Sequence, residues 1–416
     1  MSTATPAAPA GLAALTGKVI MGFVGTWVIA LMAANLVPVL IAAMVQDLGV
    51  DIATAGALAT GMTAGSALAM FITTRFIATA DRPRLGRLGL LAMVLGYGIA
   101  AALLTTPAVM GGLMLGGIGA GIMIATGTAA ASSTQNPDRT VTTVMVINRI
   151  GATALLAIAP LFHNDLRSVL IVIAALGLLG LLLAGGLPNL PASGAGLPRD
   201  AGSGVAADTA PAAASRTVTI TALVLAVSMC LWSLTEDMVY SMTSVLADQA
   251  GLTPEVSGAL LAGKVGGGLL GALLAPLALR WIGRSWSLVI IIAISTITKF
   301  IMITSGSAIA YSVSIVIWGV MYGAILVLVT GLAAVMDVTG RVGVIVSGFY
   351  LAGVAFGPLI GGQLVGVLSP VQYALVVTAP SIVFGAALFL ISRSRRKFED
   401  GNTTALPVAA PVAERA

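Results

Sequence analysis

Three basic residues, Arg149, Lys264 and Lys299, lie well inside long apolar stretches of the sequence. Only 8% of the 416 residues are charged, so a cation in such surroundings is unusual in this chain. A basic side chain at the centre of a lipid bilayer costs about 2.5–3.5 kcal/mol on the insertion scale, unless it is paired, hydrated or used to bind a ligand. The three residues therefore suggest a membrane protein that handles an anion.

Arg149 and Lys264 differ in the way they bind negative charge. An arginine guanidinium offers a planar fork for two hydrogen bonds, whereas a lysine ammonium acts as a point charge. A pair of this kind suits a carboxylate, so we expect both residues to bind a small organic anion, with a monocarboxylate as the leading candidate. Two alternatives stay open: a buried acid neutralises each cation, or Lys264 is uncharged.

Glu236 and Asp237 are the clear acidic residues inside an apolar stretch. A carboxyl group within a membrane can load and release a proton, which proton coupling requires of a transporter. Consecutive residues of a helix point about 100° apart, so we expect one of the two to face a cavity and to carry the proton. The alternatives are a counterion for Lys264 or Lys299, or a solvated helix end.

The composition predicts an all-α membrane protein. Hydrophobic residues make up 58% of the chain, and the mean hydropathy is +1.06. A soluble domain of that composition would have a largely apolar surface. Apolar runs of about 20 residues, the length that crosses a bilayer as a helix, recur along the whole chain. We expect twelve transmembrane helices, at residues 18–45, 53–79, 86–105, 107–131, 140–162, 167–187, 217–247, 254–280, 286–305, 308–335, 342–367 and 371–392.

The distribution of charge predicts how the protein sits in the membrane. Most of the twenty Lys and Arg residues fall at helix ends or in tails on one side of the expected spans. Because basic residues concentrate on the cytoplasmic side, we expect both termini to be cytoplasmic in a protein of the cell's inner membrane. The net charge of +5 is then a sign of topology, and we expect no nucleic-acid partner.

Residues 188–216 separate the expected spans into two sets of six. This segment is rich in Pro, Gly, Ala and Ser, a composition typical of a flexible linker. We therefore expect a cytoplasmic N-terminal tail, a six-helix bundle, a cytoplasmic linker, a second six-helix bundle and a cytoplasmic C-terminal tail, at residues 1–17, 18–187, 188–216, 217–392 and 393–416.

Short motifs at equivalent places in the two halves carry a family resemblance. Residues 81–87 read Asp-Arg-Pro-Arg-Leu-Gly-Arg after the second span, and residues 280–284 read Arg-Trp-Ile-Gly-Arg after the eighth. Residues 116–121 form a glycine-rich run in the fourth span. With two sets of six spans joined by a long linker, the chain resembles the major facilitator superfamily over residues 18–392. The resemblance implies two pseudo-symmetric six-helix bundles.

The resemblance also implies where the charged residues lie. In this family spans 1, 4, 7 and 10 line a central cavity, spans 5 and 8 face each other across it, and span 9 lies outside. Arg149 and Lys264 would then face one another, whereas we expect a structural role for Lys299. Several polar or aromatic residues of cavity-lining spans would contact the substrate by stacking and hydrogen bonding, with plain packing as the alternative. They are Asn35, Trp232, Tyr240, Trp318 and Tyr322.

In the same family, charges of the cytoplasmic loops hold helix ends together in one conformation. The resemblance therefore implies a gating role for Asp81, Arg82 and Arg87, and for Asp337 and Arg341 between the tenth and eleventh spans. Simple anchoring of the helix ends at the cytoplasmic surface is the alternative reading of these residues.

Together these features predict a secondary active transporter, and we expect neither an enzyme nor a cofactor. The sequence has no phosphate-binding glycine loop followed by Lys-Ser or Lys-Thr, and its single His and single Cys predict no transition-metal site. We expect a monomer that moves a small organic anion with protons by alternating access. Three alternatives remain: a proton-driven exporter of drugs or metabolites, an anion exchanger, and a non-transporting membrane sensor.

Overall fold

The computed structural model describes residues 12–74, 77, 80–131, 133–158, 165–189, 212–336 and 341–403. Helices account for nearly all of these residues, and the isolated β-bridge between Ala13 and Thr134 is the one strand-like pairing among them. This composition confirms the predicted all-α class, and it agrees with the physics of lipid, in which backbone groups must be paired inside each spanning segment.

The first half of the chain forms helices at the six predicted places. They are α1 (Gly17–Phe23), η1 (Val24–Val28), α2 (Ile29–Asn35), α3 (Val37–Leu48), α4 (Ile52–Thr74), α5 (Arg82–Leu103), α6 (Thr106–Ala131), α7 (Pro137–Ile158), α8 (Leu166–Leu183) and η3 (Ala184–Gly186). The first span is thus built from four consecutive segments, of which η1 is a short π-helix.

The second half contributes six helices, one of them very long. They are α9 (Ala212–Ser241), α10 (Thr243–Gln249), α11 (Pro254–Thr304), α12 (Ala308–Met336), α13 (Arg341–Val365) and α14 (Pro370–Thr403). Within the described ranges, 11 helical stretches are long and apolar enough to cross a membrane. The 51-residue α11 counts once, but Gly283 interrupts it with a φ of 73°. A left-handed backbone of this kind suits glycine, so α11 contains two spans and the total agrees with twelve.

Two helices extend beyond their predicted limits because helix-forming residues continue past the apolar core. Helix α14 continues past residue 392 to Thr403, through a run of Arg, Lys and Glu residues that favour helix. Helix α9 begins at Ala212, inside the segment predicted as linker. Helix α4 is described as far as Thr74 and Ile77 lies in a turn, and the predicted end at residue 79 lies outside the described residues.

Spans one and seven break at equivalent places. Leu36 and Met242 both have φ of −93° and ψ of 2°, which ends one helix and begins the next. Pro38 follows the first break and cannot donate a backbone hydrogen bond to the preceding turn. Near the second break, Ser241 and Thr243 bond backbone oxygens of Asp237 and Tyr240 through their hydroxyls, a local competition that weakens a helix. Both breaks lie close to the candidate site described below.

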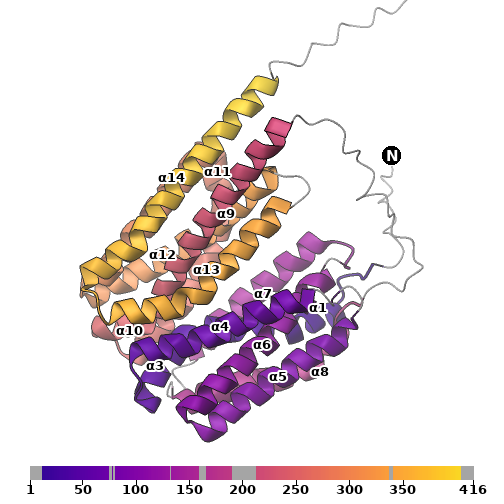
Figure 1. Ribbon diagram of the computed structural model, residues 1–416, viewed down its shortest axis with the longest axis vertical. Helices are drawn as coiled ribbons and strands as arrows, with labels where there is room; N and C mark the ends of the chain where they lie inside the picture. The colour runs from indigo at the N-terminus through magenta and orange to yellow at the C-terminus, as the bar shows by residue number, and fades with distance from the viewer. Residues whose placement is uncertain are drawn as a thin grey trace, which may run out of the picture.

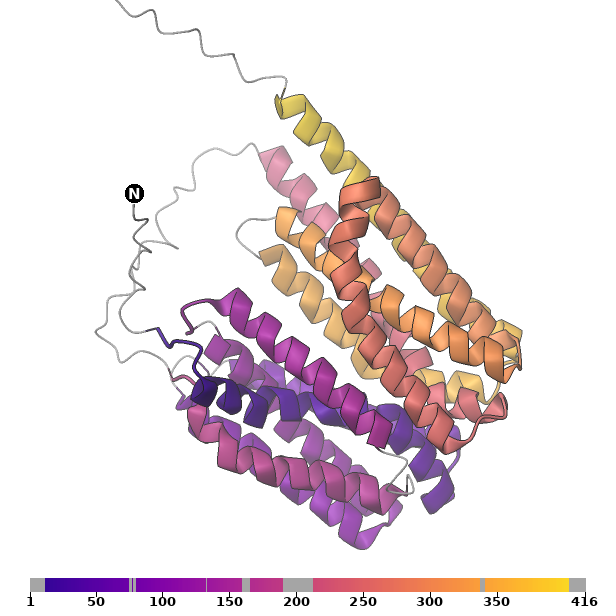
Figure 2. The same ribbon diagram turned by 180° about the vertical axis from the view of Figure 1, so that it is seen from behind.

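The helices pack as two groups that follow the order of the chain. In the first group α5 packs against α6 and α8, and α4 packs against α6; in the second, α11 packs against α12 and α14, and α9 against α13. Figures 1 and 2 show that the groups meet around α3, α4 and α10 and diverge toward the opposite end, where α9 begins and α14 ends. Helix pairs α4–α13 and α7–α11 join the two groups.

Two threonines of α4 bond the backbone of α13 across this junction. The hydroxyl of Thr63 donates to the backbone oxygen of Ala355 at 2.8 Å, and the hydroxyl of Thr60 accepts from the backbone nitrogen of Leu359 at 2.8 Å. Pro358 interrupts the hydrogen bonding of this turn, and partner groups from a neighbouring helix satisfy such turns in membranes. The contact therefore fixes the two groups together near one end.

Candidate substrate-binding site

Aromatic rings enclose the side chain of Lys264, which lies in the first span of α11. Its Nζ atom lies 3.8 Å from the centroid of the Tyr240 ring, 4.0 Å from that of Trp318 and 5.2 Å from that of Tyr322. The residue is 7% exposed. Aromatic faces attract an ammonium group, although less strongly than a carboxylate does. Across the described residues the Lys264 side chain has no hydrogen bond or ion pair, so its charge is available to an anion.

Glycines bring α12 close enough to α11 to place two of these rings. A Cβ atom at Gly319 would overlap the backbone of Lys264, one at Gly323 would overlap Gly268, and one at Gly271 would overlap Val320. Small residues at a helix interface permit such close approach in membranes. These glycines therefore allow α12 to carry Trp318 and Tyr322 to the ammonium group of Lys264.

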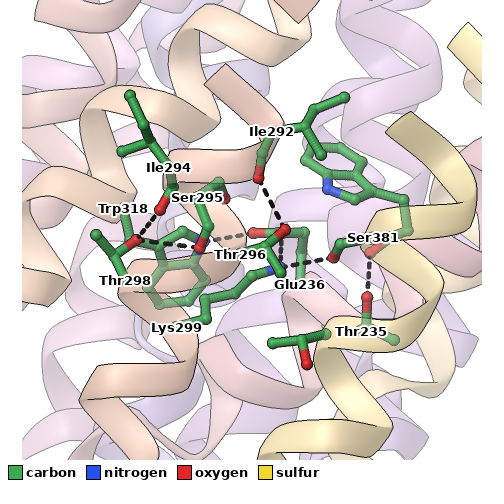
Figure 3. Close-up of polar contacts among 12 residues, drawn as sticks. Thr235, Glu236, Ile292, Ile294, Ser295, Thr296, Thr298, Lys299, Trp318 and Ser381 are labelled. Carbon is green, nitrogen blue, oxygen red and sulfur yellow. Dashed lines mark hydrogen bonds and ion pairs between the residues drawn. The ribbon is translucent and has the colours of Figure 1, made fainter. Parts of the chain in front are cut away.

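Glu236 of α9 is the counterion of Lys299. Lys299 Nζ donates to Glu236 Oε1 in an ion pair whose side chains are 0% and 4% exposed, and it also donates to Ser381 Oγ at 3.0 Å. The other carboxylate oxygen, Oε2, accepts from the indole nitrogen of Trp318 at 2.5 Å. Figure 3 shows these side chains converging from α9, α11, α12 and α14. Of the alternatives left open by the sequence, the structure therefore shows the pairing with Lys299.

Asp237, the next residue of α9, lies in a different environment. It is half-buried and lines a cavity together with Arg149 and Lys264. Its side chain packs against Gly357 of α13, where an added Cβ atom would lie 2.6 Å from Asp237 Cβ and Oδ2. Its carboxylate has no hydrogen-bond or ion-pair partner in the part of the chain that the structure describes. Asp237 is thus the acid of this region that is open to a ligand or a proton.

Arg149 approaches the same cavity from α7, in the other half of the chain. The residue is half-buried, and no carboxylate lies within ion-pair distance of it among the described residues. The adjacent Asn148 accepts a long hydrogen bond of 3.4 Å from the side chain of Asn35. Thr153, one turn further on, contacts Gly266 of α11. Helices α7 and α11 pack together and carry the two cations to one cavity, the arrangement that the family resemblance implied.

The cavity has a volume of about 130 Å³ and is walled by both halves. Its charged walls are two cations, Arg149 and Lys264, and two acids, of which Glu236 is already matched by Lys299. In their ionised forms, the unmatched groups carry a net positive charge. The lining residues are Ala34, Arg149, Ser233, Glu236, Asp237, Tyr240, Lys264, Val265, Gly268, Tyr322, Tyr350 and Val354.

The predicted substrate contacts divide into two groups. Tyr240 and Tyr322 line the cavity. Asn35, Trp232 and Trp318 lie behind it: Trp318 is fully buried and contacts Lys264, and Asn35 accepts a hydrogen bond from Tyr240 Oη at its backbone oxygen. Trp232 is also fully buried, stacked between Tyr322 and Phe384 with centroid distances of 5.7 and 5.1 Å. The position of these three residues indicates support of the cavity wall.

Tyr350 and Ser233 line the cavity but were not predicted. The Tyr350 hydroxyl lies 2.5 Å from that of Tyr322, and the Ser233 hydroxyl donates to the backbone oxygen of Tyr350. Tyr350 lies in the eleventh span, three residues before Gly353. The sequence offered one signal for Tyr350, which is a polar aromatic residue close to a run of glycines. Those glycines allow α13 to pack closely against α9 beside the cavity.

Of the predicted gating residues, Asp81, Arg82 and Arg87 make contacts within the first half of the chain in this conformation. Asp81 caps α5 by accepting from the backbone nitrogen of Arg84 at 3.1 Å. Arg82 is buried and donates to Ser133 Oγ at 2.6 Å, and the guanidinium of Arg87 lies beside Gly185. Asp337 lies outside the described residues, as does the side chain of Arg341, the first residue of α13.

Two groups of membrane-spanning helices around a charged cavity define a membrane transporter fold, and the comparisons with known proteins agree. The model of the Major Facilitator Superfamily matches residues 22–344. The chain therefore belongs to this superfamily, which makes it a multi-pass secondary transporter. No curated protein matches the sequence significantly.

Solved structures share the fold at low sequence identity. The nucleoside transporter NupG is 14% identical with a TM-score of 0.66, and the match covers 90% of this chain and 98% of that one. A bacterial homologue of the human lysosomal transporter Spinster, in an inward-facing and occupied conformation, is 14% identical with a TM-score of 0.67, with 91% and 97% covered. These likenesses extend over nearly the whole chain and support the fold.

Proposed function

We propose that this protein moves a small organic anion across the cytoplasmic membrane, coupled to protons, and that a monocarboxylate is its substrate. The observation that carries the proposal is that Arg149 and Lys264 share one small cavity and that neither has an ion-pair partner among the described residues. Without an anion, two buried or half-buried cations face a single unmatched acid, Asp237. A charge out of water is strongly stabilised by an opposite charge close to it, so the excess of cations over unmatched acids favours an anionic ligand.

The size and chemistry of the cavity favour a small molecule. A volume of about 130 Å³ is well below the roughly 300–1,000 Å³ of sites for drug-sized ligands. Arg149 would accept a carboxylate in two parallel hydrogen bonds. Lys264 would leave its aromatic surroundings to reach the same group, because a carboxylate attracts an ammonium more strongly than a ring face does.

Asp237 is the proposed carrier of the coupled proton. Its carboxylate lines the cavity near the cations. The groups that interact with it electrostatically are Lys264, Glu236, Tyr240, Tyr350 and Tyr373. When Asp237 is ionised, it competes with the substrate for Lys264 and Arg149. When it binds a proton, this competition ends and the anion binds more tightly. Substrate and proton therefore favour each other's binding, which is the condition for symport.

The arrangement of the two halves supports alternating access around this site. The halves meet at α3, α4 and α10 and diverge at the end where α9 begins and α14 ends (Figure 1). The charge distribution predicts that the diverging end is cytoplasmic, which corresponds to an inward-facing conformation. Transport would then proceed by rocking of one half against the other, with the outer contact of Thr63 and Ala355 broken and remade.

A ligand screen of the purified protein tests the proposed substrate class. Thermal stability in detergent is measured with small monocarboxylic acids, dicarboxylic acids, amines and nucleosides, the last because NupG is a nucleoside transporter. We expect stabilisation by monocarboxylates that is stronger at pH 5.5 than at pH 8. Arg149→Gln should remove the stabilisation, whereas Arg139→Gln, at an exposed position of the same helix, should keep it. Stabilisation by amines or nucleosides alone would overturn the anion assignment.

An anion exchanger is the second candidate, because it would use the same two cations. The two mechanisms differ in the role of Asp237. An exchanger swaps an internal anion for an external one, and an imposed pH gradient does not drive net uptake. A symporter accumulates substrate in response to that gradient. Uptake into proteoliposomes with and without a pH gradient separates the two.

A further inference from the structure

Behind the cavity, four side chains from four helices form a connected polar cluster. Lys299 from the second span of α11 and Ser381 from α14 lie on one side of Glu236, and Trp318 from α12 lies on the other. Lys299 is completely buried. Figure 3 shows Lys299 and Ser381 reaching Glu236 from neighbouring helices. A buried cation on a span expected to be peripheral needs a reason, because its burial is costly even when it is paired.

We propose that Lys299 and Glu236 form a permanently ionised support that positions Trp318 over Lys264, and that the transported proton is not carried by Glu236. The proposal rests on the proposed function for its transport consequences. It assigns Lys299, which does not line the cavity, as a positioning residue for the substrate site, and it leaves Asp237 as the proton carrier.

Hydrogen-bond chemistry supports a Glu236 that stays ionised. Lysine ammonium and tryptophan indole N–H groups donate and cannot accept hydrogen bonds. Lys299 faces Oε1 and Trp318 faces Oε2, so each oxygen of Glu236 meets a donor. A proton on either oxygen would make that oxygen a weaker acceptor and would weaken the hydrogen bond from its donor. The carboxylate form is the stronger acceptor for both partners, and the buried Lys299 is neutralised only in that form.

The support acts on the substrate site through Trp318. Its indole N–H is held by Glu236, and its ring lies 4.0 Å from Lys264 Nζ. Fixing the indole fixes one wall around the ammonium group, and buried charge-assisted hydrogen bonds provide such rigidity. Asp237, in contrast, is half-buried at the cavity. The charged and titratable groups that act on Glu236 are Lys299, Lys264, Asp237, Tyr322 and Tyr350.

Charge removal in two steps tests the proposal. Lys299→Met leaves Glu236 buried without a cation, so it should reduce uptake of labelled monocarboxylate by about tenfold or more. The double variant Lys299→Met with Glu236→Gln removes both charges and keeps an amide oxygen for Trp318. We expect this variant to recover most of the lost uptake, with a raised KM and with substrate accumulation still driven by a pH gradient. A glutamine cannot carry a proton, so accumulation by the double variant excludes Glu236 as the carrier.

One result of this experiment would overturn the inference. If the double variant exchanges substrate across the membrane but no longer accumulates it in a pH gradient, Glu236 is the proton carrier. If the wild-type protein takes up no carboxylic acid, that result would instead contradict the proposed function.

The positioning role of Lys299 is measured separately, by near-ultraviolet circular dichroism. The signal of Trp318 is the difference between the spectra of a protein with Trp318 and the same protein with Trp318→Phe. Lys299→Met should lose this signal and the double variant should keep it; loss in both would overturn the support.

Discussion

The hydroxyl group of Tyr240 donates a hydrogen bond of 2.7 Å to the backbone oxygen of Asn35. Tyr240 lies just before the break of span seven, and Asn35 is the last residue before the break of span one. The ring of the same tyrosine lies 3.8 Å from Lys264 Nζ. One side chain therefore joins the cation of the candidate site to the contact between the two halves.

Tyr240→Phe should keep the ring over Lys264 and remove the bond to Asn35. Hydrogen bonds between helices in membranes contribute about 0.6 kcal/mol on average and up to about 1.7 kcal/mol, which changes the ratio of two conformations by about 3- to 20-fold. We expect the contact between the halves to open more often. Faster hydrogen–deuterium exchange in residues 355–362 of α13 measures this effect, and exchange equal to that of the wild type would show that the bond does not hold the halves together.

Gly357→Ala should impair coupling by displacing Asp237. The added methyl group would lie 2.6 Å from the Cβ and Oδ2 atoms of Asp237, so the carboxylate must move. Overpacking of this kind costs about 1–3 kcal/mol. Gly348→Ala is the matched control on the same helix, because nothing lies within 4 Å of its added methyl group. We expect reduced uptake driven by a pH gradient for the first variant and normal uptake for the second; equal behaviour would contradict the packing argument.

Arg82 and Arg84 should differ in their contribution to stability despite their similar sequence context. Arg82 is 4% exposed and donates to Ser133 at 2.6 Å, and hydrogen bonds of charged groups contribute about 1.5–3 kcal/mol. The side chain of Arg84 is 82% exposed in its pair with Asp81, and exposed pairs contribute about 0–1 kcal/mol. Thermal unfolding in detergent should show a clearly lower midpoint for Arg82→Ala than for Arg84→Ala. The reverse order would indicate that Arg82 is not a structural residue.

Lys264→Met should weaken anion binding without unfolding the protein. Methionine fills a similar volume among the rings of Tyr240, Trp318 and Tyr322, and no ion pair of Lys264 is lost within the described structure. Loss of one charge-assisted contact to a carboxylate lowers affinity by roughly ten- to a hundredfold. Titration of the monocarboxylate that stabilises the wild type measures the change, and an unchanged affinity would remove Lys264 from the proposed site.

Much of the fold could be predicted from the sequence because the lipid bilayer restricts the solutions. An apolar run of about 20 residues has to be a helix in lipid, so all twelve spans were found. The ends were less predictable. Residues 393–403 continue α14 because charged helix formers tolerate water, and hydrophobicity carries no information about them.

The site was only partly predictable because side-chain partners depend on helix packing. The family resemblance implied that Arg149 and Lys264 face each other. The aromatic surroundings of Lys264 depend on how closely Gly319 lets α12 approach, and no local pattern shows this distance. Glu236 and Asp237 are adjacent acids with similar sequence surroundings, and only the position of Lys299, 63 residues further along the chain, separates their environments.

Uptake of a labelled monocarboxylate into proteoliposomes under an imposed pH gradient tests the central claim most directly. The wild-type protein should accumulate substrate when the outside is more acidic, and raising the external pH should lower the rate because Asp237 then loses its proton and competes for the cations. Asp237→Asn should abolish this accumulation and still exchange internal for external substrate. Accumulation by Asp237→Asn equal to that of the wild type, or uptake by the wild type that ignores the pH gradient, would contradict proton-coupled anion transport at this site.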